Sequence, residues 1–257
     1  SVSSGSSVYD GRVDVTAIGG AGDDSITVTD NYAGDTGTSG QSYGIASISL
    51  DGGLGNDRLS ASGGLQVTYT GGSGTDTFVL TAQQYRTLLE GARVIQGPNS
   101  TTTVVNADPI LITDFTAGLS GDLLDYGDLL RNGTLTYDGS NPFSSGFLSL
   151  EQSGANTLLK FDADGSVGTA QSAVVIAILT NVNKSTLTAA NFNPNFPPDG
   201  SPAAPQTITG TNGKDILSGT TTADVIQALD GDDTLNGKAG DDSLFGDAGN
   251  DLLTGGV

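Results

Sequence analysis

The feature that most constrains this chain is a nine-residue period in residues 207–257. From Gly210 the sequence divides into consecutive units that read GTNGKDILS, GTTTADVIQ, ALDGDDTLN, GKAGDDSLF and GDAGNDLLT. The eighth position of every unit is a large aliphatic residue. A repeat of this length is one structural unit that buries its apolar side chain only by stacking on its neighbours. The sixth position of every unit is aspartate, namely Asp215, Asp224, Asp233, Asp242 and Asp251.

The same unit occurs near the start of the chain. Copies read GGAGDDSIT at 19–27, GGLGNDRLS at 52–60 and GGSGTDTFV at 71–79. Their sixth positions are Asp24, Asp57 and Asp76, whereas a degenerate copy at 61–69 carries Gln66 there. Residues 30–44 interrupt the regular spacing as an excursion. Aspartate at one fixed position in so many units is more than ordinary turn chemistry requires.

Each unit predicts a six-residue turn followed by a three-residue strand. Strand side chains alternate between faces, so the aliphatic eighth residue points inward, and glycines supply the backbone conformations of the turn. Two units make one coil, so turns on the same side recur after two units. Carboxylates and backbone carbonyls of adjacent coils then face one another, which is an all-oxygen environment of the kind that calcium prefers.

The units GGLGNDRLS and GKAGDDSLF resemble the G-G-x-G-x-D-x-U-x nonapeptide of RTX proteins, whose fold is a calcium-bound parallel β-roll. The resemblance covers about 18–80 and 207–257 and departs from the pattern at 220–223, 228–229 and 61–66. It implies an all-β chain with two calcium-bound parallel β-rolls, each a right-handed β-solenoid, and a β-rich capping subdomain between them.

The resemblance also implies which residues hold Ca²⁺. Each ion lies between two same-side turns, bound by the aspartate of one turn and by backbone carbonyls of both. In the first block we expect Asp24 and Asp57 to bridge turns that share one edge, and the opposite edge to bind calcium poorly. In the second block the expected pairs are Asp215 with 228–233, Asp233 with 246–251, and Asp224 with 237–242. The predicted ligands are Gly19, Asp24, Gly52, Gly55, Asp57, Gly71, Gly74, Asp76, Gly210, Asp215, Asp224, Ala228, Asp230, Asp233, Gly237, Asp242, Gly246 and Asp251. Asp23, Asp232, Asp241 and Asp247 are expected to be turn residues only.

Residues 81–193 do not repeat and predict the capping subdomain. Tyr85, Leu88, Leu89 and Ala92 are spaced as on one face of a helix over 81–94, and strand-like runs occupy 109–115, 147–150, 157–161 and 174–180. The segment Ile112-Thr113-Asp114-Phe115, followed by Gly118 and 122–125, is similar to the segment that follows RTX repeats in serralysin-type proteases and alginate-epimerase R-modules. Residues 162–165 fit either a cation-binding loop or a hairpin turn.

A proline-rich stretch at 194–206 predicts a stiff linker between the two rolls. We therefore expect a first roll at 1–80, the cap at 81–193, the linker, and a second roll at 207–257. The last repeat breaks off at Gly255-Gly256-Val257. Because no signal-peptide pattern or initiator methionine opens the sequence, we expect the chain to be a piece of a longer protein.

Composition excludes several kinds of chemistry. The chain has no Cys and no His, so thiol nucleophiles, disulfides, zinc or haem sites and His-based triads are absent. Its net charge is 9 − 29 = −20, which makes nucleic acid and anionic lipid poor partners. No apolar run is long enough for membrane insertion. No residues suggest a catalytic site, and we expect that the chain is not an enzyme.

The functional expectation is a calcium-dependent structural module. A column of aspartates repels itself without cations, so folding should depend on calcium binding. The resemblance implies export through a type I secretion apparatus and folding outside the cell. Three roles remain open: a structural S-layer or adhesin region at the cell surface, with self-association; the secretion and folding tail of an exoenzyme such as a protease, lipase or epimerase; and a module that binds cell-surface glycan.

Overall fold

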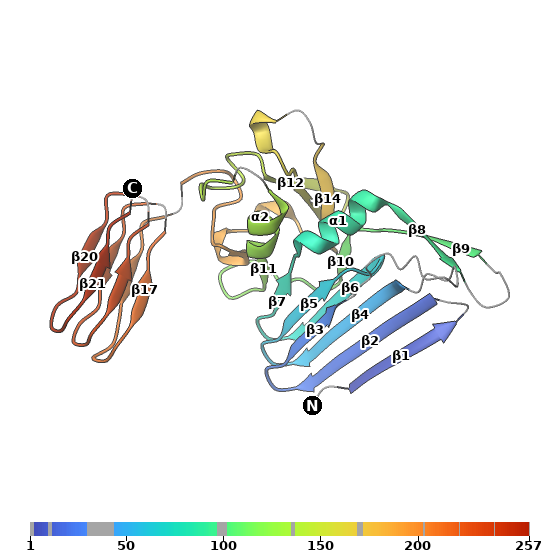
Figure 1. Ribbon diagram of the computed structural model, residues 1–257, viewed down its shortest axis with the longest axis horizontal. Helices are drawn as coiled ribbons and strands as arrows, with labels where there is room; N and C mark the ends of the chain where they lie inside the picture. The colour runs from blue at the N-terminus through green and yellow to red at the C-terminus, as the bar shows by residue number, and fades with distance from the viewer. Residues whose placement is uncertain are drawn as a thin grey trace, which may run out of the picture. The chain divides into compact units, whose positions relative to one another are not determined.

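The computed structural model describes residues 3–9, 12–29, 44–96, 102–134, 137–168, 172–202, 204–220, 222–238 and 240–256. They form two compact units (Figure 1). The first contains Ser1–Tyr137 and Ser145–Pro198, and the second contains Asp138–Ser144 and Asp199–Val257. The excursion at 30–44 falls almost entirely outside the described residues.

The first unit is built on two sheets whose strands are mostly parallel. The chain alternates between the sheets, so that each strand pair β2/β3, β4/β5 and β6/β7 makes one coil. In spatial order, the eight-stranded sheet contains β1 (Ser3–Tyr9), β2 (Arg12–Ala21), β4 (Gly44–Leu54), β6 (Gln66–Ser73), β10 (Ile110–Ile112), β14 (Val174–Leu179), β13 (Asn156–Phe161) and β12 (Leu148–Ser153). The five-stranded sheet contains β15 (Phe192–Asn193), β11 (Leu123–Asp125), β7 (Thr77–Val79), β5 (Arg58–Ser62) and β3 (Ser25–Thr29).

The core of this unit lies between the two sheets. Inward-pointing Leu50 and Leu59 have no exposed surface, and neither do Tyr69 and Phe78. The rings of Tyr69 and Phe78 stack with centroids 6.0 Å apart. The Tyr69 hydroxyl accepts a hydrogen bond from the backbone N–H of Ala61 at 2.6 Å, so the one polar group of the ring is satisfied inside the core.

Strands from the middle of the chain extend both sheets. Strand β10 lies parallel to β6, and β11 lies parallel to β7, so together they form a further coil on the first roll. Strand β14 then adds to β10, and β15 adds to β11. All four strands predicted in the middle region are present, as β10, β12, β13 and β14. Short 3₁₀ segments follow as η2 (Gly165–Val167), η3 (Lys184–Thr186) and η4 (Ala189–Asn191).

The predicted helix is present but shorter than the sequence suggests. Helix α1 (Ala82–Glu90) begins at Thr81, whose side chain accepts a hydrogen bond from the backbone N–H of Gln84, and it ends at Gly91 with φ of 76°. Leu89 was expected on the buried face but is 51 % exposed, whereas Gln84 is fully buried. The prediction for Leu89 was wrong because α1 packs through a face that includes polar residues. The remaining elements are α2 (Gly127–Gly133) and the hairpin of β8 (Ala92–Gln96) and β9 (Thr102–Asn106).

The second unit is a smaller roll of two three-stranded parallel sheets. One contains β16 (Thr207–Thr209), β18 (Val225–Gln227) and β20 (Ser243–Phe245). The other contains β17 (Ile216–Ser218), β19 (Thr234–Asn236) and β21 (Leu252–Thr254). Ile226, Ala228 and Leu235 form the buried core between them. No helix in the described part of the chain is long and apolar enough to cross a membrane.

Candidate metal centres

The repeat aspartates of the first unit form a ladder of hydrogen bonds from turn to turn. Asp57 Oδ1 accepts a hydrogen bond from the backbone N–H of Asp24 at 2.7 Å. Asp76 Oδ1 accepts from the backbone N–H of Asp57 at 2.8 Å. The turns at 19–24, 52–57 and 71–76 therefore lie in one column, with each aspartate directly over the backbone of the previous coil.

The second unit contains two such columns. On one edge, Asp233 Oδ1 accepts from the N–H of Asp215 at 2.7 Å, and Asp251 Oδ1 accepts from the N–H of Asp233 at 3.0 Å. On the other edge, Asp242 Oδ1 accepts from the N–H of Asp224 at 2.9 Å. The structure thus places the turns in the same columns as the nine-residue spacing does.

Where a repeat turn begins with glycine, the second carboxylate oxygen of its aspartate faces that glycine. A Cβ atom at Gly210 would lie 2.6 Å from Asp215 Oδ2 and 2.7 Å from the carbonyl oxygen of Ala228. A Cβ at Gly219 would lie 2.6 Å from the Gly237 carbonyl oxygen and 2.7 Å from Asp224 Oδ2. In these turns a carboxylate oxygen and a carbonyl of the next coil converge on the same small space, which a Cβ atom would fill. The turn of Asp233 begins instead with Ala228, which is fully buried.

Several of these carboxylate oxygens are buried without a hydrogen-bond donor. Asp57 Oδ2, Asp233 Oδ2 and Asp242 Oδ2 have no hydrogen-bond partner in the described part of the chain. Asp57 and Asp233 are each 2 % exposed. An unsatisfied buried carboxylate is costly unless a cation or a donor compensates it. The donor set of carboxylate and carbonyl oxygens fits a hard cation such as calcium.

Burial raises the pKa of two neighbouring aspartates in the first unit. It raises the pKa of Asp76 to about 6, and the charges of Asp122, Asp57 and Asp114 raise it further against the opposing effect of a backbone hydrogen bond. Burial likewise raises the pKa of Asp122. A carboxyl group whose ionisation is this unfavourable is stabilised when a cation neutralises the column.

The column of the first unit has a fourth member that the sequence analysis did not assign. Asp122, in the segment that joins β10 to β11, accepts from the backbone N–H of Asp76 through Oδ1 at 2.8 Å and from that of Thr116 through Oδ2 at 2.7 Å. Asp114 accepts from the backbone N–H of Gly71 at 2.9 Å and of Gly72 at 2.8 Å. The signal was present in the motif at 112–125, which was interpreted only as a cap.

Other polar residues singled out from the sequence make local bonds. Asp23 accepts from the N–H of Asn56 at 2.7 Å, and Asp232 accepts from the N–H of Asn250 at 2.8 Å, so both link their own turn to the turn of the adjacent coil. The side-chain amide of Gln66 donates to Asp108 at 3.0 Å. Asp230 is exposed, in a turn whose backbone bridges to Ala248.

The loop at 162–165 lies between the antiparallel strands β13 and β14. Asp162 Oδ1 accepts from the backbone N–H of Asp164 at 3.2 Å. Burial, and then the side-chain hydrogen bond and charge of Asp164, raise the pKa of Asp162. The loop is therefore a strand connection that brings two carboxylates together.

No three acidic side chains of the described residues come close enough to form a metal site by themselves. A cation bound in the columns must therefore take most of its ligands from backbone carbonyls. This suits the turns, because carbonyls of successive coils lie beside the glycines: the Gly22 carbonyl oxygen would meet a Cβ at Gly55 at 2.5 Å. Gly55 has a φ of 126°, which side chains other than hydrogen rarely allow.

Comparison with known proteins identifies these turns. A family profile described as the RTX calcium-binding nonapeptide repeat (4 copies) matches residues 49–64, 209–244 and 228–257. These segments are RTX calcium-binding repeats. The matched RTX segments include the turn of Asp57 and all the repeat turns of the second unit, whereas the copies at 19–27 and 71–79 lie outside them.

Two solved structures similar to this RTX-containing chain are subunits of a mannuronan C5-epimerase from Azotobacter vinelandii. The AlgE6R3 subunit is 22% identical, with 68% of this chain and 78% of that chain covered and a TM-score of 0.33. The AlgE6R2 subunit is 21% identical, with 69% of this chain and 93% of that chain covered and a TM-score of 0.26. A search of curated proteins finds none that matches.

Proposed function

We propose that this chain is the non-catalytic, calcium-folded region of a larger bacterial protein that leaves the cell by type I secretion and acts structurally at the cell surface, as in an S-layer or an adhesin. The observation that carries the proposal is the set of buried, donor-less carboxylate oxygens of Asp57, Asp233 and Asp242. They repeat along columns that match the RTX calcium-binding motif. Such columns are stable only when cations compensate them.

Calcium is held, in this proposal, between adjacent turns of one column. The aspartate of one turn supplies a carboxylate oxygen, and backbone carbonyls of both turns supply the other ligands. In the first unit the ions lie between the turns of Asp24, Asp57 and Asp76. Both oxygens of Asp122 already accept backbone N–H bonds, so we assign it to closing the column. The other ligands are those predicted from the sequence except Asp224, because both of its oxygens likewise accept backbone N–H bonds, from Gln206 and Thr220.

Binding energy then becomes folding energy, because the site does not exist in the unfolded chain. Extracellular calcium modules have dissociation constants of about 10⁻⁴–10⁻³ M. At the far lower calcium concentration of a cytoplasm the rolls stay unfolded, which suits passage through a secretion channel. Outside the cell they fold and become rigid.

Electron microscopy of the chain tests the structural role. The chain is compared in about 5 mM calcium, above the range of such sites, and in chelator. Ordered sheets or filaments that form in calcium and dissolve in chelator support the structural role. Folded, monodisperse particles at high protein concentration would contradict it and favour the role of an exoenzyme tail.

A further inference from the structure

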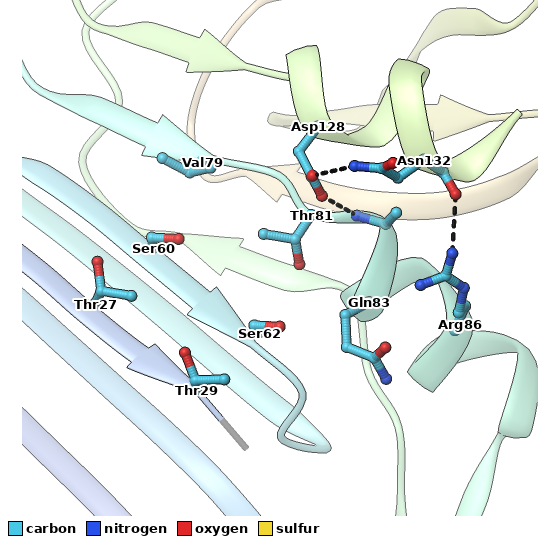
Figure 2. A pocket seen from close by; sticks show the side chains of 11 residues that line it. Thr27, Thr29, Ser60, Ser62, Val79, Thr81, Gln83, Arg86, Asp128 and Asn132 are labelled. Carbon is cyan, nitrogen blue, oxygen red and sulfur yellow. Dashed lines mark hydrogen bonds between the residues drawn. The ribbon is translucent and has the colours of Figure 1, made fainter. Parts of the chain in front are cut away.

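A polar groove lies on the outer face of the five-stranded sheet, beside helices α1 and α2 (Figure 2). Its volume is about 560 Å³, within the range of about 300–1,000 Å³ that is usual for small-molecule sites. The groove belongs wholly to the first unit, and none of its lining residues is a repeat aspartate. The calcium sites therefore do not explain it.

The floor of the groove carries a regular array of hydroxyl groups. Thr27 pairs with Ser60, and Thr29 pairs with Ser62, in the register of β3 and β5. Their side chains alternate with inward-pointing Ile26 and Leu59, so they point to the outer face. Neighbouring strands are about 4.8 Å apart, and alternate residues of a strand are about 6.6 Å apart. Figure 2 shows no hydrogen bond from these hydroxyl groups to the rest of the groove.

The wall of the groove is held in place by its own hydrogen bonds. Asp128 accepts from the backbone N–H of Ala82 at 2.9 Å and from the Asn132 amide at 2.7 Å. Arg86 donates one hydrogen bond to the Asn132 carbonyl oxygen at 2.9 Å, and its guanidinium carries further N–H donors. The wall therefore joins α1 to α2 and presents Arg86 and Gln83 to the groove (Figure 2).

The chemistry of the lining selects the class of ligand. Hydroxyl and carboxamide groups both donate and accept hydrogen bonds, and the charges of Arg86 and Asp128 cancel. A polyanion would meet one arginine on a chain of net charge −20. An apolar ligand would strip water from the four hydroxyl groups and replace none of their hydrogen bonds. A ligand with many hydroxyl groups and no charge satisfies all of these groups.

We propose that this groove binds a neutral oligosaccharide. The floor supplies spaced hydroxyl partners for successive sugar units, and Gln83 and Arg86 bond to the sugar oxygens from the side. None of the described residues that line the groove is aromatic, so they do not supply the stacking that strengthens many sugar sites. We therefore expect millimolar affinity, equivalent to about −4 kcal/mol. The inference goes beyond the proposed function, because it holds whether or not the rolls assemble at a surface.

Nuclear magnetic resonance of the isotope-labelled chain in calcium tests the inference. The probes are cellotetraose, maltotetraose and mannotetraose, with oligogalacturonate as the charged comparator. Saturable shifts of the amide signals of Thr27, Ser60 and Gln83 with a neutral tetrasaccharide are expected. Two results would overturn the proposal. One is a shift of these signals with oligogalacturonate alone, and the other is the absence of any shift with all four probes at about ten times the expected millimolar dissociation constant.

Two variants localise the binding. The double variant Thr27→Val/Thr29→Val removes two hydroxyl groups with little change of shape, and it should weaken binding about fivefold or more. Thr207→Val, on an exposed strand position of the second unit, is the matched control and should leave binding unchanged. Equal affinity of the double variant and the control would show that the sugar does not bind on this floor. Circular dichroism in calcium confirms that both variants are folded. The same measurement shows whether the unsubstituted chain folds with calcium at all, so that failure of the proposed function is distinguished from failure of sugar binding.

Discussion

Replacing Asp233 by asparagine separates the two roles of a repeat aspartate. Oδ1 accepts the hydrogen bond from the Asp215 N–H at 2.7 Å, and the asparagine carbonyl can keep this bond. Oδ2 is buried without a donor, so the substitution removes the charge that calcium would neutralise. The variant should therefore hold calcium less well while the calcium-free chain becomes no less stable.

The size of the effect follows from the charge at that position. Unit charges about 4 Å apart interact by about 4 kcal/mol at an effective dielectric constant of 20, and desolvation offsets much of this. If about one third of this interaction energy remains as the net loss, the calcium concentration at the midpoint of folding rises about tenfold. In chelator, removal of an unsatisfied buried carboxylate should stabilise by about 1 kcal/mol.

The assay is a calcium titration of folding, followed by far-UV circular dichroism. Asp232→Asn is the matched control, because Asp232 is the neighbouring residue and is exposed, and the asparagine carbonyl can still accept the hydrogen bond from the Asn250 N–H of the adjacent coil. The control should move the midpoint less than about twofold. Equal midpoints for Asp233→Asn and the control would refute the reasoning, since the buried oxygen would then take no part in binding.

Further substitutions test the packing and the charge pairs. Gly52→Ala places a Cβ against the carboxylate of its own turn and against the carbonyl of the next coil. It should lower the free energy of unfolding in calcium by about 2 kcal/mol or more, measured by chemical denaturation. Gly255→Ala, whose Cβ meets nothing within 4 Å, should leave that free energy unchanged. Leu59→Ala, fully buried, should cost about 2–5 kcal/mol, and Leu119→Ala, 88 % exposed, less than about 0.5 kcal/mol. The pKa of Asp162 is raised, so its ionised form destabilises the fold as pH rises through the folded pKa. Asp162→Asn should therefore raise the thermal midpoint of unfolding at pH 7 and leave it unchanged near pH 3, below the unfolded pKa of about 3.9. A thermal midpoint at pH 7 that the substitution lowers only when calcium is present would instead indicate a cation in this loop.

Much of the roll could be read from the sequence because the period is regular. Aspartate at the sixth position and a large apolar residue at the eighth predict a turn and an inward strand residue, and the two-unit coil predicts which turns meet. The structure brings Asp215, Asp233 and Asp251 into one column for this reason. The register of β16–β18–β20 follows the same spacing.

The parts that could not be predicted depend on contacts between segments distant in the sequence. Asp122 joins the aspartate column only because β10 and β11 add to β6 and β7, and its turn does not have the nine-residue length. Leu89 is exposed because α1 also buries Gln84, whose amide donates to the Gly64 carbonyl oxygen at 3.3 Å. The polar groove likewise requires the placement of α1 and α2 beside β5, which no local pattern contains.

The central claim of this account is that calcium binding and folding of the rolls are coupled. Far-UV circular dichroism of the whole chain, titrated from chelator to about 10 mM calcium with magnesium as the control, tests it most directly. The account predicts a cooperative change from coil to β-structure with calcium and none with magnesium. Full β-structure in chelator would contradict it, because the aspartate columns would then be stable without a cation.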